Sequence, residues 1–321
     1  MQKDINTSDL ILTADWHIRS DVPENRKDDF LHAQEKKIDF ILAQSDKYQA
    51  SILIAGDLGN KPKWENWLLE KYIKKFKAHS QRIYVLPGQH DLPCHRLDKL
   101  PESGIGVLAA SLAIKLLDLE MIFCGGKCPV FPFPFGKEVV NIEDYDKGQK
   151  YSGYYNLVAV IHQLIVKSKL WVAQENFTYA KSLLEKFPCY NLIVSGDNHQ
   201  SFIEKYKDRI LVNPGSIMRS TVAQYDHLPK IYLWKAKNNS VETIDIPIKS
   251  ALDVFDLSYS EDEKKKDERM SAFVDSLQMD GEVKMSFKKN LERFFRKNRV
   301  NQKVKDKIFM SLEKGKYKKG G

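Results

Sequence analysis

Carboxylate, imidazole and amide side chains gather at the ends of five short apolar runs in this chain. The runs are LILTADWH, SILIAGD, RIYVLPGQHD, LVAVIHQ and NLIVSGDNHQ. Apolar runs of about five residues bounded by Gly, Pro or Asn are typical of buried strands. Ligands collect beyond the carboxyl ends of such strands, which is where all five polar clusters stand. We therefore expect one fold to bring the five clusters together as a metal centre.

The types of these side chains predict a centre with two metal ions. The candidate ligands are three carboxylates, three imidazoles and one amide: Asp15, Asp57, Asp197, His17, His162, His199 and Gln89. This set is too large for one ion, and these ligand types coexist around Mn²⁺, Fe²⁺ or Zn²⁺. A carboxylate after a small glycine, as in Gly56-Asp57, suits a bridge between two close ions. Such a centre activates water and clamps the oxygens of a phosphoryl displacement.

The first half of the chain alternates strands and helices that would position these side chains. Strands are expected at residues 10–14, 52–55 and 83–86, with helices near residues 25–47 and 64–79. This order favours parallel strands joined by helical crossovers.

The second half is expected to resume this alternation and then to become antiparallel. Its expected elements are strands at residues 157–161 and 192–194, a helix near residues 174–187, and strands at residues 201–205, 210–212, 230–234 and 241–246. Together the halves predict an α/β protein, a two-sheet β-sandwich flanked by helices with a C-terminal helical extension.

Two stretches between the halves carry separate expectations. Residues 111–123 hold two apolar runs that meet at the polar residues Asp118 and Glu120, which predicts a hairpin. Residues 127–136 read KCPVFPFPFG. Because proline cannot donate to the ladder of a central strand, we expect this stretch to be a packed loop near the site.

Charge separates the body of the chain from a basic C-terminal segment. The 321 residues carry a formal net charge of +8, and residues 282–321 hold fourteen Lys and Arg against four Asp and Glu. We expect a catalytic domain over residues 1–250, a linker or cap helix over 251–280, and a basic helix–loop–helix over 281–321. The basic segment fits either contact with nucleic acid or a solvated helical face. The apolar stripe of these helices fits either packing against a partner protein or packing against the rest of this chain.

Composition argues against a membrane protein and against export. No run of eighteen apolar residues is present, and the N-terminus carries no apolar signal region. The scattered cysteines Cys94, Cys124, Cys128 and Cys189 are typical of buried thiols in a reducing compartment. These features predict a cytoplasmic protein, in the host cytoplasm if the chain is phage-encoded, with no membrane partner.

The ordered motifs resemble those of the calcineurin-like metallophosphoesterases over roughly residues 9–250. Within that superfamily, DWHIRSD, GDLGN, PGQHDLP, GDNHQSF and NPGSIMRST look like the SbcD-type DNA repair nucleases, most closely the phage form. The resemblance implies the metallophosphoesterase fold and an exonuclease, with single-strand endonuclease activity as a further option, in DNA repair and recombination. It also implies docking of an SbcC-type coiled-coil ATPase on the C-terminal helices, and a homodimer.

The same resemblance implies roles for individual residues. Asp15, His17 and His199 would hold the first metal, Asp57 would bridge, and Gln89, His162 and Asp197 would hold the second. His90 would be a catalytic residue outside the ligand set that stabilises or protonates the leaving oxygen. Asp91 would fix the tautomer of His90.

Two departures from the family pattern fall on the second metal. Gln89 stands where the family usually has Asn, and Asp197 stands where it usually has His. Asp197 adds negative charge, which favours Mn²⁺, with Mg²⁺ as an alternative, over Zn²⁺. Three other readings stay open: an inactive centre, a small-molecule phosphodiesterase or phosphatase, and a DNA-binding regulatory subunit with weak nuclease activity.

Overall fold

The computed structural model describes residues 9–118, 120–124, 128–141, 156–168, 176–256, 295, 301–302 and 304–305. The chain divides into two compact units, residues 1–257 and residues 258–321. Almost all described residues belong to the first unit, to which the following account is confined. The predicted linker over residues 251–280 begins with a short helix, α5 (Ala251–Val254). The rest of that linker and nearly all of the predicted helix–loop–helix lie outside the described residues.

The first sheet carries the alternation of strands and helices that the sequence predicts. Its order is β14-β13-β1-β2-β3-β4, and β1 to β4 run parallel. The strands are β1 (Leu10–Thr13), β2 (Ser51–Ile54), β3 (Ile83–Val85), β4 (Lys115–Leu116), β13 (Lys230–Lys235) and β14 (Ser240–Asp245). The crossover helices are α1 (Phe30–Tyr48) and α2 (Asn66–Ala78), and α3 (Gly104–Ala110) precedes β4. Helix α1 begins later than predicted because Asp29 caps it, its carboxylate accepting the His32 N–H at 3.1 Å.

The second sheet is more parallel than expected. Its order is β11-β12-β10-β7-β6-β5, and β6, β7, β10 and β12 are parallel neighbours. The strands are β5 (Ile122–Cys124), β6 (Cys128–Phe133), β7 (Val158–His162), β10 (Leu192–Gly196), β11 (Phe202–Tyr206) and β12 (Arg209–Asn213). The predicted antiparallel second half is confirmed for β12 with β11 and for β13 with β14, whereas β12 runs parallel to its other neighbour, β10. The predicted helix near residues 174–187 is shorter, because α4 (Ala180–Lys186) follows a two-stranded ribbon of β8 (Ile165–Val166) and β9 (Thr178–Tyr179).

Two predictions for the middle of the chain are wrong. The expected hairpin over residues 111–123 is absent, because β4 pairs with β3 in the first sheet and β5 pairs with β6 in the second. The Pro- and Phe-rich stretch forms β6, which lies between β7 and β5. Within the described residues, β5 covers only Cys128, Pro129 and Val130 of β6. Beyond Val130 that side of β6 has no strand partner, where a missing proline N–H costs least.

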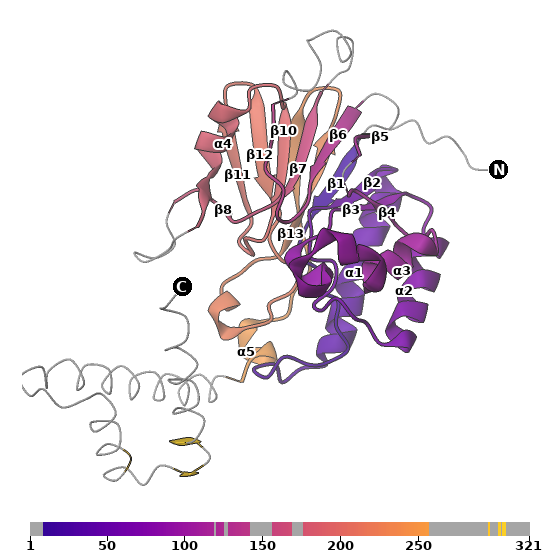
Figure 1. The fold of residues 1–321 in the computed structure, drawn as a ribbon, viewed down its shortest axis with the longest axis vertical. Helices are drawn as coiled ribbons and strands as arrows, with labels where there is room; N and C mark the ends of the chain where they lie inside the picture. The colour runs from indigo at the N-terminus through magenta and orange to yellow at the C-terminus, as the bar shows by residue number, and fades with distance from the viewer. Residues whose placement is uncertain are drawn as a thin grey trace, which may run out of the picture. The chain divides into compact units, whose positions relative to one another are not determined.

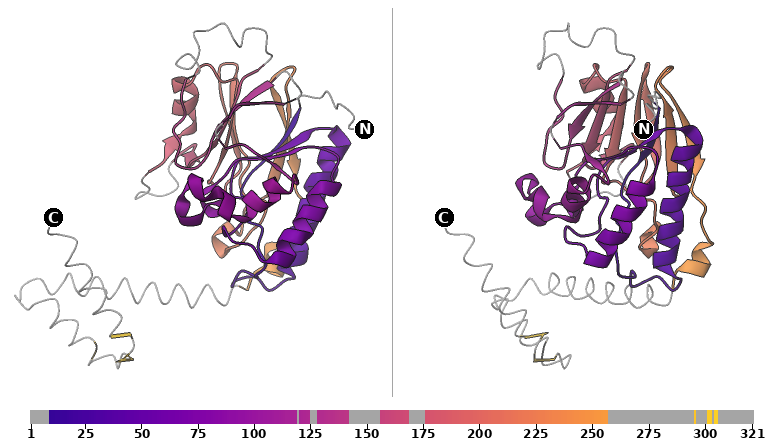
Figure 2. Two further views of the ribbon diagram at one scale, coloured as in Figure 1. Left: turned by 45° about the vertical axis from the view of Figure 1, so that its right-hand side comes forward. Right: turned by 90° about the vertical axis from the view of Figure 1, so that its right-hand side faces the viewer.

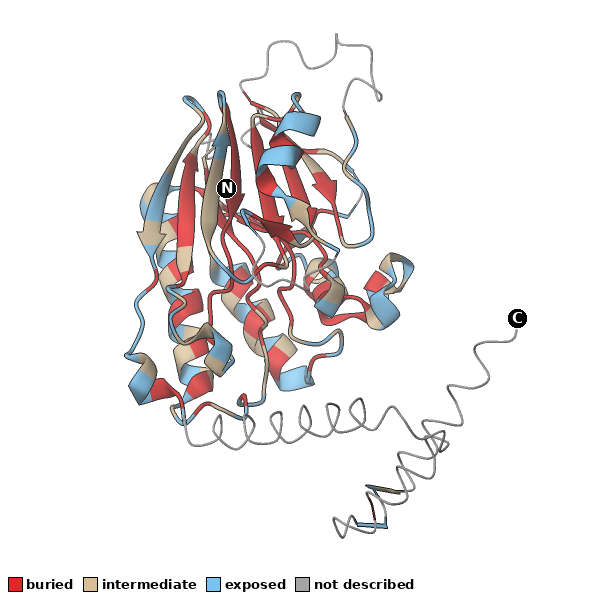
Figure 3. Ribbon diagram, turned by 90° about the vertical axis from the view of Figure 1, so that its left-hand side faces the viewer, coloured by how far each residue is buried: buried red, intermediate tan, exposed pale blue. Residues whose placement is uncertain are grey.

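The two sheets pack face to face and helices cover their outer sides (Figures 1 and 2). Alternate residues of each strand serve the two faces: Leu10 and Leu12 join the core between the sheets, whereas Ile11 packs with the helices of the first sheet. Strands buried on both faces explain the continuous apolar runs of the sequence. Figure 3 shows the buried strands in red in the upper part of the view and helices with both buried and exposed residues below them. The α/β sandwich flanked by helices is thus confirmed. None of the described helices combines the length and apolar character needed to cross a membrane.

Candidate metal centre

All five polar clusters meet at one edge of the sandwich. Asp15 and His17 follow β1, Asp57 follows β2, and Gln89, His90 and Asp91 form a 3₁₀ turn after β3. His162 is the last residue of β7, and Asp197 and His199 follow β10. Because these strands are parallel within each sheet, their carboxyl ends lie together, and facing sheets contribute the two sides of the site.

Asp57 lies at the centre of this arrangement. Three imidazole nitrogens surround its Oδ2 atom: Nε2 of His162 at 3.4 Å, Nε2 of His17 at 3.9 Å and Nε2 of His90 at 4.0 Å. Its other oxygen, Oδ1, accepts the backbone N–H of His90 at 2.9 Å. The side chain of Asp57 is only 1% exposed. A buried carboxylate that faces imidazoles from both sheets has the position of a bridge between two ions.

The first half-site is formed by Asp15, His17 and His199. Nε2 of His17 and Nε2 of His199 lie 3.1 Å apart, and the ligand atoms of the three residues all lie within 4.8 Å of one another. Oδ1 of Asp15 accepts the backbone N–H of Asp197 at 3.2 Å, which holds this carboxylate against the loop after β10. Two imidazoles and one carboxylate converging in this way have the composition of a divalent metal site.

Gln89, His162 and Asp197 are the predicted ligands of the second ion, here called the second half-site, and two of them are bonded to each other. Nε2 of Gln89 donates to Oδ1 of Asp197 at 2.6 Å. Nδ1 of His162 lies 2.8 Å from the carbonyl oxygen of Ala55 and donates there, so Nε2 is the ring nitrogen that faces Asp57. Among the described residues, the groups of carboxylates and imidazoles that converge within ligand distance include His162 with Asp15 and Asp57, but none includes Asp197.

Several buried polar atoms of the site make no hydrogen bond within the described structure. They are Oδ2 of Asp15, Nδ1 of His17, Oδ2 of Asp57, Oε1 of Gln89 and Nε2 of His162. Buried polar atoms are nearly always paired, so such a cluster of exceptions requires an explanation. Carboxylate oxygen, amide oxygen and imidazole nitrogen are ligands for divalent transition metals. The residues present therefore fit metal ions.

The backbone at the site is held in an uncommon conformation. Four of the candidate ligands have positive φ: Asp15 at 51°, His17 at 45°, Asp57 at 52° and Asp197 at 84°. A non-glycine residue in the left-handed region costs roughly 1–3 kcal/mol, and such residues cluster at functional sites. Gly56, at φ +100°, is needed for a related reason: a Cβ there would lie 1.9 Å from Nδ1 of His162. The sequence suggested that Gly56 admits metal ions, and in the structure it admits the His162 ring.

Burial and the shared carboxylate drive the pKa values of the two histidines apart. Burial lowers the pKa of His17 to about 3, against the opposing effect of Asp57. Burial also acts to lower the pKa of His162, but Asp57 and Asp15 outweigh it and raise that pKa to about 10. Burial acts to raise the pKa of Asp57, yet His162 and His17 lower it to about 2. Without a metal, a proton on His162 therefore supplies the positive charge that Asp57 attracts.

The described structure gives the Asp91 carboxylate backbone partners, and its predicted role toward His90 stays a prediction. Its carboxylate accepts backbone N–H groups from Gly59 at 2.8 Å, Gly88 at 3.0 Å and Leu58 at 3.3 Å, and no hydrogen bond to the His90 imidazole is described. Asp91 thus joins the loop after β2 to the loop after β3. The His90 side chain is 47% exposed, far more than Asp57 beneath it, so it stands at the open side of the site.

Sequence reasoning missed Gln224. Its Nε2 lies 3.3 Å from Nδ1 of His199 and 3.0 Å from the Ser216 hydroxyl oxygen, while its Oε1 accepts the backbone N–H groups of Ser220 and Thr221. Gln224 lies in a short 3₁₀ turn, Val222–Gln224, far from any strand end. The only sequence signal is its position three residues after Thr221, where a capping box would place it.

Comparison with known proteins places the fold and the strand-end residues in one family. The model of the calcineurin-like phosphoesterase family matches residues 9–201. The chain belongs to this family. Members of the family typically bind two divalent metal ions, and this metallophosphoesterase has a candidate site for them. It is accordingly a hydrolase of phosphate esters.

Solved structures resemble this metallophosphoesterase at low sequence identity. One is a novel archaeal phosphodiesterase, 14% identical, which covers 74% of this chain and 99% of its own, with a TM-score of 0.40. Another is a Staphylococcus aureus protein assigned as a 5′-nucleotidase and solved with alpha-ketoglutarate. It is 13% identical and covers 75% of this chain and 55% of its own, with a TM-score of 0.47. No curated protein matches the sequence.

Proposed function

We propose that this metallophosphoesterase is a DNA nuclease that hydrolyses phosphodiester bonds with two divalent ions, Mn²⁺ above others. The observation that carries the proposal is the convergence of the five strand-end clusters around Asp57, with buried ligand atoms that make no hydrogen bond within the described residues. The order and the amino-acid sequences of the motifs are similar to those of SbcD-type nucleases, and this similarity supports DNA as the substrate. Exonuclease action is proposed first, with cleavage of single-stranded DNA as a second activity.

We assign each half-site one ion. Asp15, His17 and His199 hold the first, Gln89, His162 and Asp197 hold the second, and Asp57 faces both. When bound, such ions lower the pKa of a water molecule and neutralise charge on the phosphate. The protein's part is to fix the ligands: the Ala55 carbonyl sets the His162 tautomer, and the Asp91 carboxylate ties the Asp57 loop to the Gln89 loop.

His90 is the proposed catalytic residue outside the ligand set. Its backbone N–H is bonded to Asp57 and its ring stands over the same carboxylate, so its position is set by the centre itself. Because its side chain is exposed, the imidazole can donate a hydrogen bond or a proton to the leaving oxygen of a bound phosphodiester. His90 also lies within ligand distance of His17 and Asp57, so the metal stoichiometry of a His90 variant decides between the two roles.

The partners proposed from the sequence resemblance concern the C-terminal segment. Residues 282–321 carry fourteen Lys and Arg against four Asp and Glu, a charge balance that favours DNA. We propose that the helices predicted there dock an SbcC-type ATPase, that the chain forms homodimers and that it acts in the cytoplasm. The predicted helix–loop–helix lies almost wholly outside the described residues.

A second candidate is a phosphodiesterase for small molecules. One observation favours it: a cavity of about 750 Å³ adjoins the centre and is lined in part by Asp197, His199 and His227. A volume of this size can hold a nucleotide-sized substrate.

Assays with two substrates separate these candidates. The full chain with Mn²⁺ is expected to release nucleotides from duplex DNA, and Asp57→Asn should reduce that rate by at least about a hundredfold because it removes the shared carboxylate. Asp46→Asn, on the exposed side of α1, is the matched control. Hydrolysis of bis-p-nitrophenyl phosphate with no release from any DNA would reject the nuclease and favour the second candidate.

A further inference from the structure

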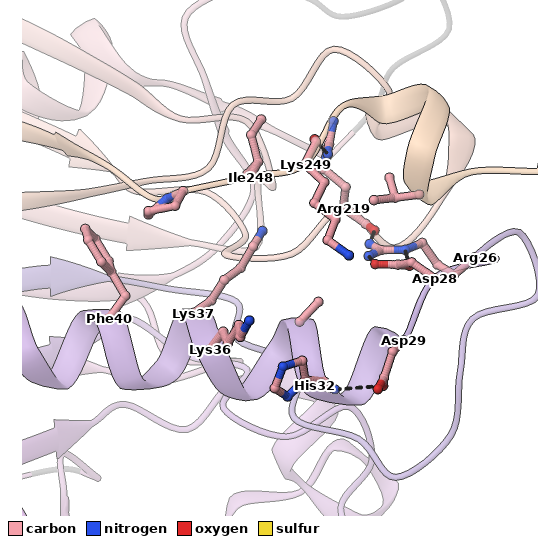
Figure 4. Close-up of a pocket in the computed structure, with 13 residues that line it drawn as sticks. Arg26, Asp28, Asp29, His32, Lys36, Lys37, Phe40, Arg219, Ile248 and Lys249 are labelled. Atoms are coloured by element: carbon pink, nitrogen blue, oxygen red, sulfur yellow. Dashed lines mark hydrogen bonds and ion pairs between the residues drawn. The ribbon is translucent and has the colours of Figure 1, made fainter.

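A second cavity lies in the same unit and shares no residue with the metal centre. It has a volume of about 460 Å³, and helix α1 lines one side (Figure 4). Its cationic lining residues are Arg26, Lys36, Lys37, Arg219 and Lys249, with His32 beside them. The carboxylates in the lining are Asp28 and Asp29. The lining of the cavity therefore carries more positive than negative side chains, whereas the metal centre contributes the carboxylates of Asp15, Asp57 and Asp197.

Three of these cations are nearly buried. Arg26 is 9% exposed, Lys37 is 8% and Arg219 is 4%. Asp28 neutralises one of them, because its two oxygens accept two hydrogen bonds from Arg26, both at 2.8 Å. Asp29 is engaged as the cap of α1. Two buried positive charges, those of Lys37 and Arg219, are left without a carboxylate from the cavity lining.

The hydrogen bonds of these two residues do not supply the missing negative charge. Lys37 Nζ donates to the carbonyl oxygen of Ile217 at 2.7 Å. Arg219 donates to the carbonyl oxygens of Tyr225 at 3.3 Å and Lys249 at 2.6 Å. All of these acceptors are neutral. Burying charge without a counter-ion is costly, so the arrangement favours an anionic ligand. Burial together with Arg219 and Arg26 lowers the pKa of Lys37 to about 7, so the charge on Lys37 is disfavoured without an anion beside it and is favoured when one binds.

The rest of the cavity wall is apolar. Phe40, Ile248 and Val254 line it, and Figure 4 shows Phe40 and Ile248 on the side where Lys37 lies, with Arg26 and Arg219 on the other side. A ligand with one charged end and one apolar or aromatic end matches this division. The volume lies in the range of small-ligand pockets.

We propose that this cavity binds a phosphate-bearing ligand of nucleotide size, with its phosphate against Lys37 and Arg219 and its organic part against Phe40 and Ile248. A phosphate dianion balances both buried charges, and the planar Arg219 guanidinium suits its oxygens. The phosphate can belong to a free nucleotide or to the end of a nucleic acid strand. The chemistry of recognition is the same in both cases.

Calorimetry on the full chain tests the proposal with the metal centre emptied by EDTA. The probes are inorganic phosphate, AMP and a short 5′-phosphorylated oligothymidylate. The test variant is Lys36→Glu/Lys249→Glu, since both lysines are exposed at the rim and their change leaves the core intact. Lys47→Glu, exposed on the same helix outside the cavity, is the control.

We expect wild-type protein and Lys47→Glu to bind AMP or the oligonucleotide more tightly than inorganic phosphate, and the double variant to bind at least tenfold more weakly. Preference for AMP identifies a nucleotide site, and preference for the oligonucleotide identifies a strand-end site. Absence of binding by all three probes, or equal binding by the double variant, overturns the proposal. Because the metal is removed and neither lysine belongs to the metal centre, failure here leaves the proposed nuclease untouched.

Discussion

The two halves of the proposed metal centre differ in the kind of hydrogen bond that joins their own candidate ligands. In the first half, the Nε2 atoms of His17 and His199 share a hydrogen bond of 3.1 Å between two imidazoles. In the second half, Gln89 and Asp197 are already joined by a hydrogen bond of 2.6 Å. An ion that recruits Asp197 Oδ1 must displace that bond, and hydrogen bonds to charged groups contribute about 1.5–3 kcal/mol. We infer that the second half-site binds its ion more weakly than the first half-site does. We also infer that the main role of Asp197 is to orient Oε1 of Gln89 toward that ion.

Removing one imidazole from each half gives the sharpest comparison. We predict that His17→Ala abolishes the tighter of two Mn²⁺ binding events and that His162→Ala abolishes the weaker one. Either change should lower phosphodiester hydrolysis by at least about a hundredfold, because activation of water requires both ions. Titration calorimetry gives the stoichiometry, with His32→Ala, an exposed residue of α1, as control. Loss of both ions in each variant would mean that the halves are not separate sites.

Changing Gln89 tests the weaker half alone. Gln89→Ala removes an unpaired buried oxygen, so we predict that the second ion loses about 10- to 100-fold in affinity while the first is unchanged. Asp197→Ala should have a smaller effect on that ion if Asp197 mainly orients Gln89. The same calorimetric titration measures both variants. A larger loss in Asp197→Ala would show that its carboxylate is the principal ligand.

The dependence of metal binding on pH should also differ between the halves. The raised pKa of His162, about 10, means that its ring carries a proton at neutral pH in the metal-free protein. A metal at the second half-site must displace that proton, so its affinity should rise with pH by up to about tenfold per unit between pH 6 and 9. His17, with its pKa lowered to about 3, is already deprotonated there and adds no such slope, although burial raises the pKa of Asp15 in the same half-site and leaves that carboxyl a smaller contribution. Mn²⁺ titrations at pH 6, 7 and 8 measure the slopes, and equal slopes would contradict the difference.

The residues of the centre were predictable because a physical rule connects them. Asp15, Asp57 and Asp197 each follow a buried run, and the carboxyl ends of parallel strands share an edge. The rule also gives the fold class, since runs apolar on both faces require helices outside. It says nothing about hydrogen bonds within the cluster. The bond between Gln89 and Asp197 joins residues 108 positions apart in loops of facing sheets, and it depends on side-chain reach rather than strand order.

The errors of sequence interpretation also have physical causes. Proline disfavours a central strand and so predicts a loop over residues 127–136, but beyond Val130 no described strand pairs with one side of β6, where a missing N–H is tolerated. Two adjacent apolar runs predict a hairpin, although β4 and β5 enter different sheets. Local pattern cannot distinguish a turn within one sheet from a crossing between two sheets, because both end apolar runs with polar residues.

Asp91 is the remaining test, because it supports both halves without belonging to either. Its carboxylate accepts N–H groups beside Asp57, which faces both half-sites, and beside Gln89, which belongs to the second. In Asp91→Asn an NH₂ group replaces one acceptor oxygen, so at least one backbone N–H loses its hydrogen bond. We therefore predict a loss of about 1–3 kcal/mol in the free energy of unfolding, measured in urea. Both ions should lose affinity by only a few-fold, in equal measure, because the shared carboxylate of Asp57 shifts with its loop. Weakening of the second ion alone would show that Asp91 acts through the Gln89 loop and that Asp57 is held by other contacts.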